Sequence, residues 1–167
     1  MSANGSAGGV FMCFGSVAGE AKTPAQISKA PASGGWMPLE SCQWAGSMNY
    51  GARSSERTSD TADASPVVIT KVTDASSTGL LRQAILGDFS NQAVIVFLRT
   101  GTGGKAEEYL RLELQDCGIV GFDIAGTGDE RSLETYTIHY AAMDVRSFTF
   151  EGTSQRSQVS YTIRNQS

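Results

Sequence analysis

The sequence EEYLRLELQD, residues 107–116, alternates between apolar and polar side chains. Leucine occupies positions 110, 112 and 114, and polar or amphipathic side chains occupy the positions between them. Because successive side chains of a β-strand point to opposite faces, this pattern predicts a strand with one face in a core and the other toward solvent.

The segment before it, AVIVFL at residues 93–98, is apolar at every position. A strand of this composition is covered on both faces, here by the core and by a helix or another subunit. The turn between the two strands is TGTGGKA, residues 100–106, which suits a hairpin. We therefore predict a core or subunit-interface strand made of Val94, Ile95, Val96, Phe97 and Leu98.

The segment after it, GFDIAGTGDERSLETYTIHYAAMDVRSFTF at residues 121–150, contains a glycine pair followed by alternating residues. A phosphate-binding glycine loop requires a helix after it, so Gly126 and Gly128 are predicted to form a turn between strands. Tyr136, Ile138 and Tyr140 keep one parity and Met143 keeps the other. This switch at Ala141–Ala142 indicates a β-bulge or a strand that crosses between sheets.

Further strands are expected at residues 10–14, 37–44, 67–72 and 159–164. In the last of these, Val159, Tyr161 and Ile163 should point inward. One helix is expected at STGLLRQAILGD, capped by Ser76 or Ser77 and ended by Gly87. Its buried face should consist of Leu80, Leu81, Ala84 and Ile85.

The composition limits the classes of function. A chain of 167 residues fits one domain, and a net charge of -4 does not favour nucleic acid as a partner. No apolar run is long enough for membrane insertion, and the start, MSANGSAGG, lacks the features of a signal peptide. Cys13, Cys42 and Cys117 lack metal-ligand spacing and are expected to be buried free thiols.

No catalytic residue, cofactor site or metal site is expected. His139 is the only histidine and should lie on the polar face of its strand, without an identifiable nucleophile. The protein is therefore not expected to be an enzyme. An alternative is a ligand-binding or carbohydrate-binding β-sandwich, in which Trp36, Trp44 and Tyr50 would line an exposed face.

Residues 47–66, SMNYGARSSERTSDTADASP, form the longest polar stretch. Such a segment inside a small domain is either a mobile loop or a functional contact with a partner. Both interpretations remain open from the composition alone.

Several segments together resemble the haemolysin-coregulated protein (Hcp) family of type VI secretion systems. They are VFMCFGSVAGEA (10–21), GGWMPLESCQW (34–44), SPVVITKVTDASS (65–77) and EYLRLELQDCGIVGFDIAGTGDERSLETYTIHYAAMDV (108–145), followed by VSYTIR (159–164). The resemblance implies a mainly β fold: a small β-barrel of two antiparallel sheets with one short α-helix, assembling into a ring. Residues 10–167 would form this single domain, and residues 1–9 a flexible N-terminal extension.

The resemblance also implies a function. Hexameric rings would stack into the inner tube of the secretion machine, which is propelled from the cell and carries or chaperones effectors. Partners would be further copies of the chain and the spike, sheath and effector proteins. The protein would start in the bacterial cytoplasm and leave without a signal peptide. The tube protein of a contractile phage tail is the nearest alternative.

The resemblance places an extended loop between the second and third strands, where residues 47–66 lie. Its charged side chains are predicted to contact the next ring through ion pairs of both signs. These residues are Arg53, Glu56, Arg57, Asp60 and Asp63.

Overall fold

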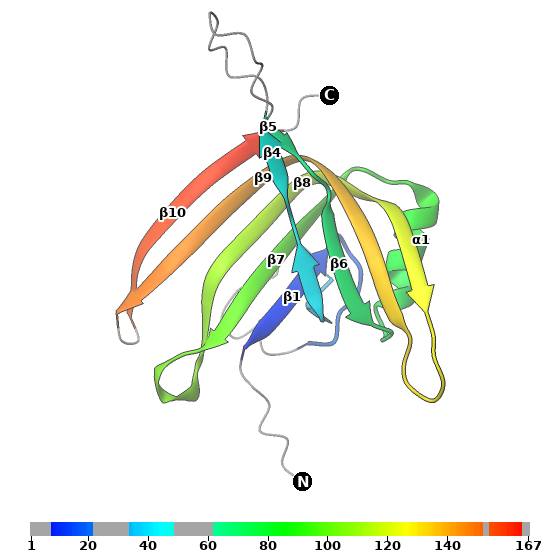
Figure 1. The fold of residues 1–167 in the computed structure, drawn as a ribbon, viewed down its shortest axis with the longest axis horizontal. Helices are drawn as coiled ribbons and strands as arrows, with labels where there is room; N and C mark the ends of the chain where they lie inside the picture. The colour runs from blue at the N-terminus through cyan, green and yellow to red at the C-terminus, as the bar shows by residue number, and fades with distance from the viewer. Residues whose placement is uncertain (1–7, 22–33, 49–61, 152–153, 165–167) are drawn as a thin grey trace, which may run out of the picture.

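The computed structural model of the chain describes residues 8–21, 34–48, 62–151 and 154–164. These residues form an antiparallel β-structure with one α-helix, as predicted (Figure 1). The elements are β1 (Gly9–Phe14), β2 (Met37–Leu39), β3 (Ser41–Gln43), β4 (Gly46–Met48), β5 (Ala62–Ala64), β6 (Val67–Val72), α1 (Ser77–Leu86), β7 (Asn91–Thr100), the 3-10 turn η2 (Thr102–Gly104), β8 (Ala106–Ala125), β9 (Leu133–Glu151) and β10 (Ser154–Arg164).

The two ends of the main sheet are joined by β2 and β3, which follow one another in the chain. Its strand order is β2-β1-β7-β8-β9-β6-β3, so β2 and β3 lie at opposite ends of the path. Only Glu40 separates these two strands in the chain, and its N–H donates to the Thr70 carbonyl at 2.8 Å. β2 and β3 together therefore join β1 to β6 and complete a small barrel. The second sheet is the two-stranded ribbon of β4 and β5.

The core fills the barrel from all sides. A fully buried Val, Leu, Ile, Phe or Met side chain contributes about 1.5–3 kcal/mol to the stability of a fold. The fully buried members of this core include Met12, Phe14, Met37, Val67, Ile69, Leu80, Ile95, Tyr136, Ile138, Tyr140 and Met143. Leu112 and Leu114 also lie in this core, as the alternation in residues 107–116 predicts, and Leu110 is half-buried.

The strand predicted from AVIVFL is covered on both faces by the chain itself. Ala93 and Ile95 face the barrel core, and Phe97 packs against that core. Val94, Val96 and Leu98 form a second cluster with Cys13 and Trp36. Within the described residues these side chains are therefore buried by the chain itself, and Trp36, just before β2, packs against the second face of the strand.

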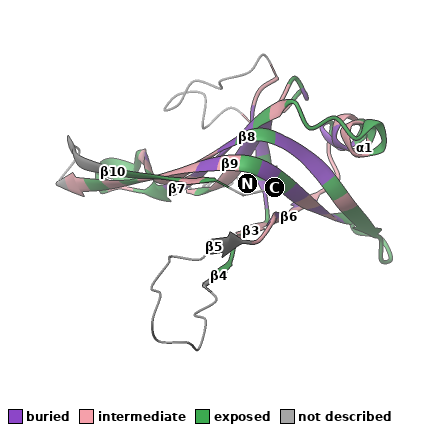
Figure 2. Ribbon diagram, turned by 90° about the horizontal axis from the view of Figure 1, so that it is seen from above, coloured by how far each residue is buried: buried purple, intermediate pink, exposed green. Residues whose placement is uncertain are grey.

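Helix α1 has the predicted ends but a narrower buried face. Ser76 occupies the N-cap position, and Gly87 follows the helix with a left-handed φ of 63°. Leu80 enters the core, with Leu81 and Ala84 packed against it. Ile85 is 77% exposed, contrary to the prediction. Figure 2 shows that the side of α1 facing away from the sheet is exposed.

The predicted irregularity at Ala141–Ala142 involves two strands at once. Leu114 pairs with Met143 and Cys117 pairs with Tyr140, and all four side chains are buried. Inward positions are therefore three residues apart at this point in both β8 and β9. In β8 the additional residue is Asp116, whose backbone has a left-handed φ of 46°. The register of β7 against β8 shifts at the same point. Because β8 and β9 change parity together, their own ladder continues unbroken.

The C-terminal strand β10 lies outside the barrel. It pairs with residues 142–151 of β9, beyond the part of β9 that pairs with β6. Figures 1 and 2 show it extending the sheet away from α1. Val159 is 66% and Tyr161 is 71% exposed, so the prediction that they point into a core is wrong for this chain taken alone.

The close approach of the segment after α1 to β8 gives a test of this packing. A Cβ atom at Gly118 would lie 2.7 Å from a ring carbon of Phe89 and 2.8 Å from the Asp88 carbonyl oxygen. We expect Gly118→Ala to lower the free energy of unfolding by about 1–3 kcal/mol, measured by urea denaturation. Gly121→Ala on the same strand is the control, since its Cβ would meet Thr137 only at 3.9 Å. Equal stability of the two variants would contradict this packing.

Candidate functional site

The predicted inter-ring segment begins and ends in a ribbon. Gly46 pairs with Ala64, Ser47 with Asp63 and Met48 with Ala62, so β4 and β5 form two short strands that the sequence analysis did not predict. Figure 2 shows this ribbon standing away from the main sheet. Asp63 lies in β5, whereas Arg53, Glu56, Arg57 and Asp60 lie outside the described residues.

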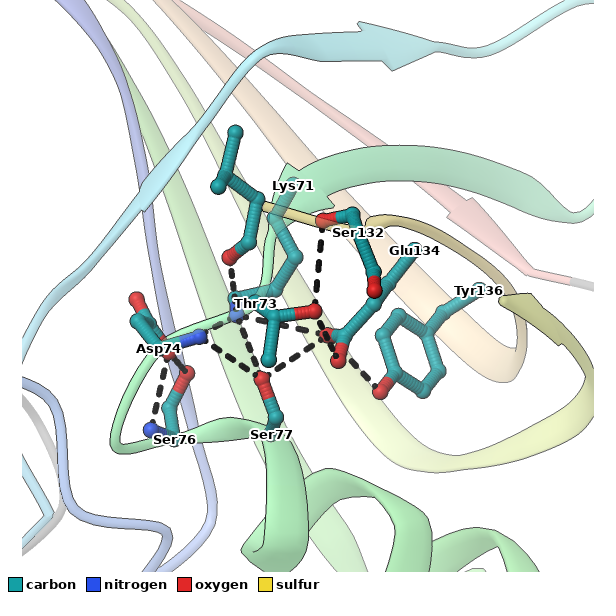
Figure 3. Close-up of polar contacts among 9 residues, drawn as sticks. Lys71, Thr73, Asp74, Ser76, Ser77, Ser132, Glu134 and Tyr136 are labelled. Carbon is teal, nitrogen blue, oxygen red and sulfur yellow. Dashed lines mark hydrogen bonds and ion pairs between the residues drawn. The ribbon is translucent and has the colours of Figure 1, made fainter. Parts of the chain in front are cut away.

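A buried polar cluster lies where β6, β9 and the start of α1 meet (Figure 3). Lys71 and Glu134 are direct partners in the pairing of β6 with β9, and both are almost completely buried. The Lys71 Nζ lies 2.8 Å from Asp74 Oδ1 and 3.4 Å from Glu134 Oε2. It also donates to Ser77 Oγ at 3.2 Å and to the Val72 carbonyl at 2.9 Å.

The carboxylates of the cluster have further partners. Ser77 and Tyr136 each donate to Glu134 Oε2, at 3.0 and 3.1 Å, and Thr73 donates to its Oε1 at 3.1 Å. Burial opposes ionisation of Asp74, but hydrogen bonds from Lys71 and Ser76 outweigh it and lower the pKa of that carboxyl. Burial and the adjacent Glu134 raise the pKa of the Tyr136 hydroxyl.

This arrangement is structural rather than catalytic. A serine beside a lysine can act as a nucleophile with its base, but the serine must be accessible to a substrate. Here Lys71 is held between two carboxylates, and Ser77 is 4% exposed. The cluster instead joins the first turn of α1 to two strands of the barrel.

The sequence carried a signal for this cluster that the sequence analysis missed. Lys71 has the same parity as the buried Val67 and Ile69, and Glu134 has the same parity as the buried Tyr136. Two opposite charges at inward positions of two strands indicate a buried pair, because a single buried charge is too costly.

Two open strand edges carry exposed apolar side chains. Within the described residues, the pairing of β7 with β8 ends at Cys117, so residues 118–125 of β8 pair with β9 alone, although the segment after α1 packs against Gly118. Val120, Phe122 and Ile124 on this stretch are 45–52% exposed. β10 likewise has β9 on one side, and it carries Val159 and Tyr161. We refer to these as the β8 edge and the β10 edge.

The arginines of the outer sheet face are paired with acids. Arg111 and Arg146 are directly opposite each other in the ladder of β8 and β9. The Arg111 Nε lies 2.7 Å from Glu113 Oε1, and the Arg146 Nε lies 2.8 Å from Asp144 Oδ2. Glu113 also contacts Arg146 at 3.4 Å, which offsets the repulsion between the two cations.

The other predicted features are placed as follows. Cys13 and Cys117 are buried and Cys42 is partly buried, all as free thiols. Burial raises the pKa of Cys117 to about 12 and that of Cys42 to about 11, so both are protonated at neutral pH. His139 is exposed, on the polar face of β9 as predicted.

The carbohydrate-binding alternative requires an exposed aromatic face, and neither tryptophan that the structure describes is fully exposed. Trp36 is 1% exposed and Trp44 is half-buried, whereas Tyr50 lies outside the described residues. Across the described ranges, no group of three or more acidic, histidine or cysteine side chains could hold a metal ion. No helix in the described part of the chain is long and apolar enough to cross a membrane.

Comparisons with known proteins point to one family. Residues 11–158 match the family model described as "Type VI secretion system effector, Hcp". A search of curated proteins by sequence found no match.

Solved structures share the fold at low identity. One titled as a type six secretion system protein has a TM-score of 0.72 at 14% identity, covering 90% of each chain. Hcp1 from E. coli EAEC 042 has a TM-score of 0.70 at 14% identity, covering 93% of this chain and 97% of that one. A type VI secretion system effector from Yersinia pestis has a TM-score of 0.65 at 16% identity, covering 93% and 99%.

The buried polar cluster gives a prediction about stability. Lys71→Met leaves Glu134 and Asp74 buried without their cation, and we expect it to lower the free energy of unfolding by about 3–5 kcal/mol. Lys105→Met, at an exposed turn position, is the control and should change stability by less than about 0.5 kcal/mol. Urea denaturation measures both.

A second variant separates charge from packing. Lys71→Met combined with Glu134→Leu should recover part of the lost stability, because it also removes one of the two carboxylates left without their cation. A Lys71→Met protein as stable as Lys105→Met, or a double variant less stable than Lys71→Met, would contradict the assignment.

Proposed function

The chain belongs to the Hcp family, a structural family of type VI secretion tube proteins and not of enzymes, and we propose that six copies of it close into a ring. Rings then stack into the inner tube of the secretion machine, which is propelled from the cell. In the family the protein is secreted and associates with itself. The number six, the stacking and the surfaces involved are the proposal for this chain.

The observation that carries the proposal is the pair of open edges. An exposed strand edge with apolar side chains is a liability in a lone subunit, because its backbone groups can pair with another chain. The β8 edge and the β10 edge are unlike surfaces at different places on the sheet. A contact between unlike surfaces of identical subunits is head-to-tail, and it closes into a ring when the rotation allows.

Stacking is assigned to the segment that the ribbon of β4 and β5 presents. Arg53, Glu56, Arg57, Asp60 and Asp63 offer charges of both signs for contact with the next ring. Each exposed ion pair contributes only about 0–1 kcal/mol. Stacking therefore depends on several copies acting together and weakens at high salt.

The remaining partners follow from the same role. Spike and sheath proteins meet the tube at its end and its outer wall, and effectors travel in or on it. The protein is made in the bacterial cytoplasm and leaves through the type VI system.

The ring can be tested through the β10 edge. Native mass spectrometry of the parent protein should show six copies. Val159→Ser with Tyr161→Ser should give mainly monomers, because the exposed apolar area of the β10 edge is lost. Ser160→Ala, between them on the strand, is the control and should keep the ring. A monomeric parent at micromolar concentration, or a hexameric double variant, would count against the proposal.

The contact between rings can be tested by replacing the stacking segment. Replacing residues 51–61 by a short Gly-Ser linker keeps β4 and β5, and should leave single rings intact while abolishing tube growth and secretion. Sedimentation reports the rings, and negative-stain microscopy reports the stacks. Parent tubes should also shorten as salt increases. Tubes of normal length from the linker variant would show that this segment is not the contact between rings.

A further inference from the structure

The ribbon of β4 and β5 directly continues the β3–β6 pair of the barrel, and one hydroxyl group contacts its base. Trp44, just before β4, donates from its Nε1 to the Tyr140 hydroxyl oxygen at 2.7 Å. That hydroxyl in turn donates to the Ser65 carbonyl, just after β5, at 3.1 Å. Tyr140 lies on β9 and is fully buried. One phenolic group therefore contacts both legs of the ribbon.

The two legs are also joined to each other at this level. Ala45 donates its N–H to Ser65 Oγ at 3.1 Å, and the Ser65 N–H and hydroxyl both donate to the Ala45 carbonyl, at 2.9 and 2.5 Å. Pro66 follows and fixes the backbone φ as the chain enters β6. The base of the ribbon is thus a closed unit.

The direction of this unit relative to the barrel is set at its base, where β3 leads into β4 and β5 leads into β6. The ribbon is a separate two-stranded sheet, without ladder hydrogen bonds to the main sheet among the described residues. Trp44 packs against the barrel core with its apolar part, and its N–H is oriented by Tyr140. A two-stranded ribbon alone is marginally stable in water. Its direction therefore depends on the attachment at its base.

We propose that Tyr140 is a positioning residue for assembly: its hydroxyl, through Trp44 and Ser65, holds the ribbon in the direction that stacking of rings requires. This inference rests on the proposed function, which assigns the contact between rings to the segment that the ribbon presents. Tyr140 acts through the ribbon and makes no contact with the next ring itself.

The strand offers a matched control for the test. Tyr136 lies four positions earlier on β9, on the same face, and is also fully buried with a hydrogen-bonded hydroxyl. The Tyr136 hydroxyl donates to Glu134, which belongs to the buried polar cluster near the start of α1 and not to the ribbon. Tyr140→Phe and Tyr136→Phe remove the same atom from similar surroundings.

We expect Tyr140→Phe to form hexameric rings like the parent but to require about a tenfold higher protein concentration for tube growth. Its amide hydrogens at residues 44–48 and 62–65 should exchange faster than those of Tyr136→Phe. Trp44→Phe removes the same hydrogen bond from the other side. The Trp44→Phe/Tyr140→Phe double variant should therefore lose little more tube growth than either single variant, because coupled partners are not additive.

The outcomes separate this inference from the proposed function. Tubes that persist after replacement of residues 51–61 contradict the stacking assignment, and the exchange measurement then still tests how the ribbon is held. If that replacement abolishes tubes but Tyr140→Phe grows them at the parent concentration, the inference is overturned. Ribbon exchange equal to that of Tyr136→Phe, or additive losses in the double variant, also overturns it.

Discussion

The antiparallel pairing of β8 with β9 is the contact on which the rest of the structure depends. The ladder runs from Leu110 opposite Ser147 to Ala125 opposite Leu133, in strands of 20 and 19 residues. Strands in globular proteins are usually about 3–10 residues long, so this pair is longer than a small barrel needs. Its middle forms the barrel wall, and its ends extend beyond the wall. β6 and β10 divide the other side of β9 between them.

β9 also anchors two long connections of the chain through its inward side chains. Near the hairpin, Glu134 and Tyr136 belong to the cluster that attaches the start of α1. Further along, Tyr140 attaches the base of the β4–β5 ribbon. Polar groups at these depths must be hydrogen-bonded, and the partners that satisfy them come from the connecting segments. The same strand therefore builds the core and fixes the segments that leave it.

Because β8 and β9 extend beyond the barrel wall, a single chain has exposed apolar side chains along its strand edges. Val120, Phe122 and Ile124 on one edge and Val159 and Tyr161 on the other are exposed although they are apolar. Monomeric soluble proteins limit contiguous exposed apolar area, and they protect strand edges from pairing. The Hcp family is one whose members associate with themselves, and the ring proposed above would cover both edges.

The class of fold, most strands and the described α-helix could be predicted from the amino-acid sequence, because alternation, turn glycines and helix caps are local patterns, and the family could be predicted from the resemblance of several segments. The sequence also located the irregularity at Ala141–Ala142, since a change of parity is visible in one strand. Only the tertiary structure decided which element covers each surface. Trp36 covers the second face of β7, Lys71 meets Glu134, and Tyr140 joins Trp44 to Ser65. Each of these contacts joins residues far apart in the chain, and a side chain's parity gives its face but not the partner that meets it there. For the same reason Val159 and Tyr161 have an inward parity on a strand that lies beyond the core.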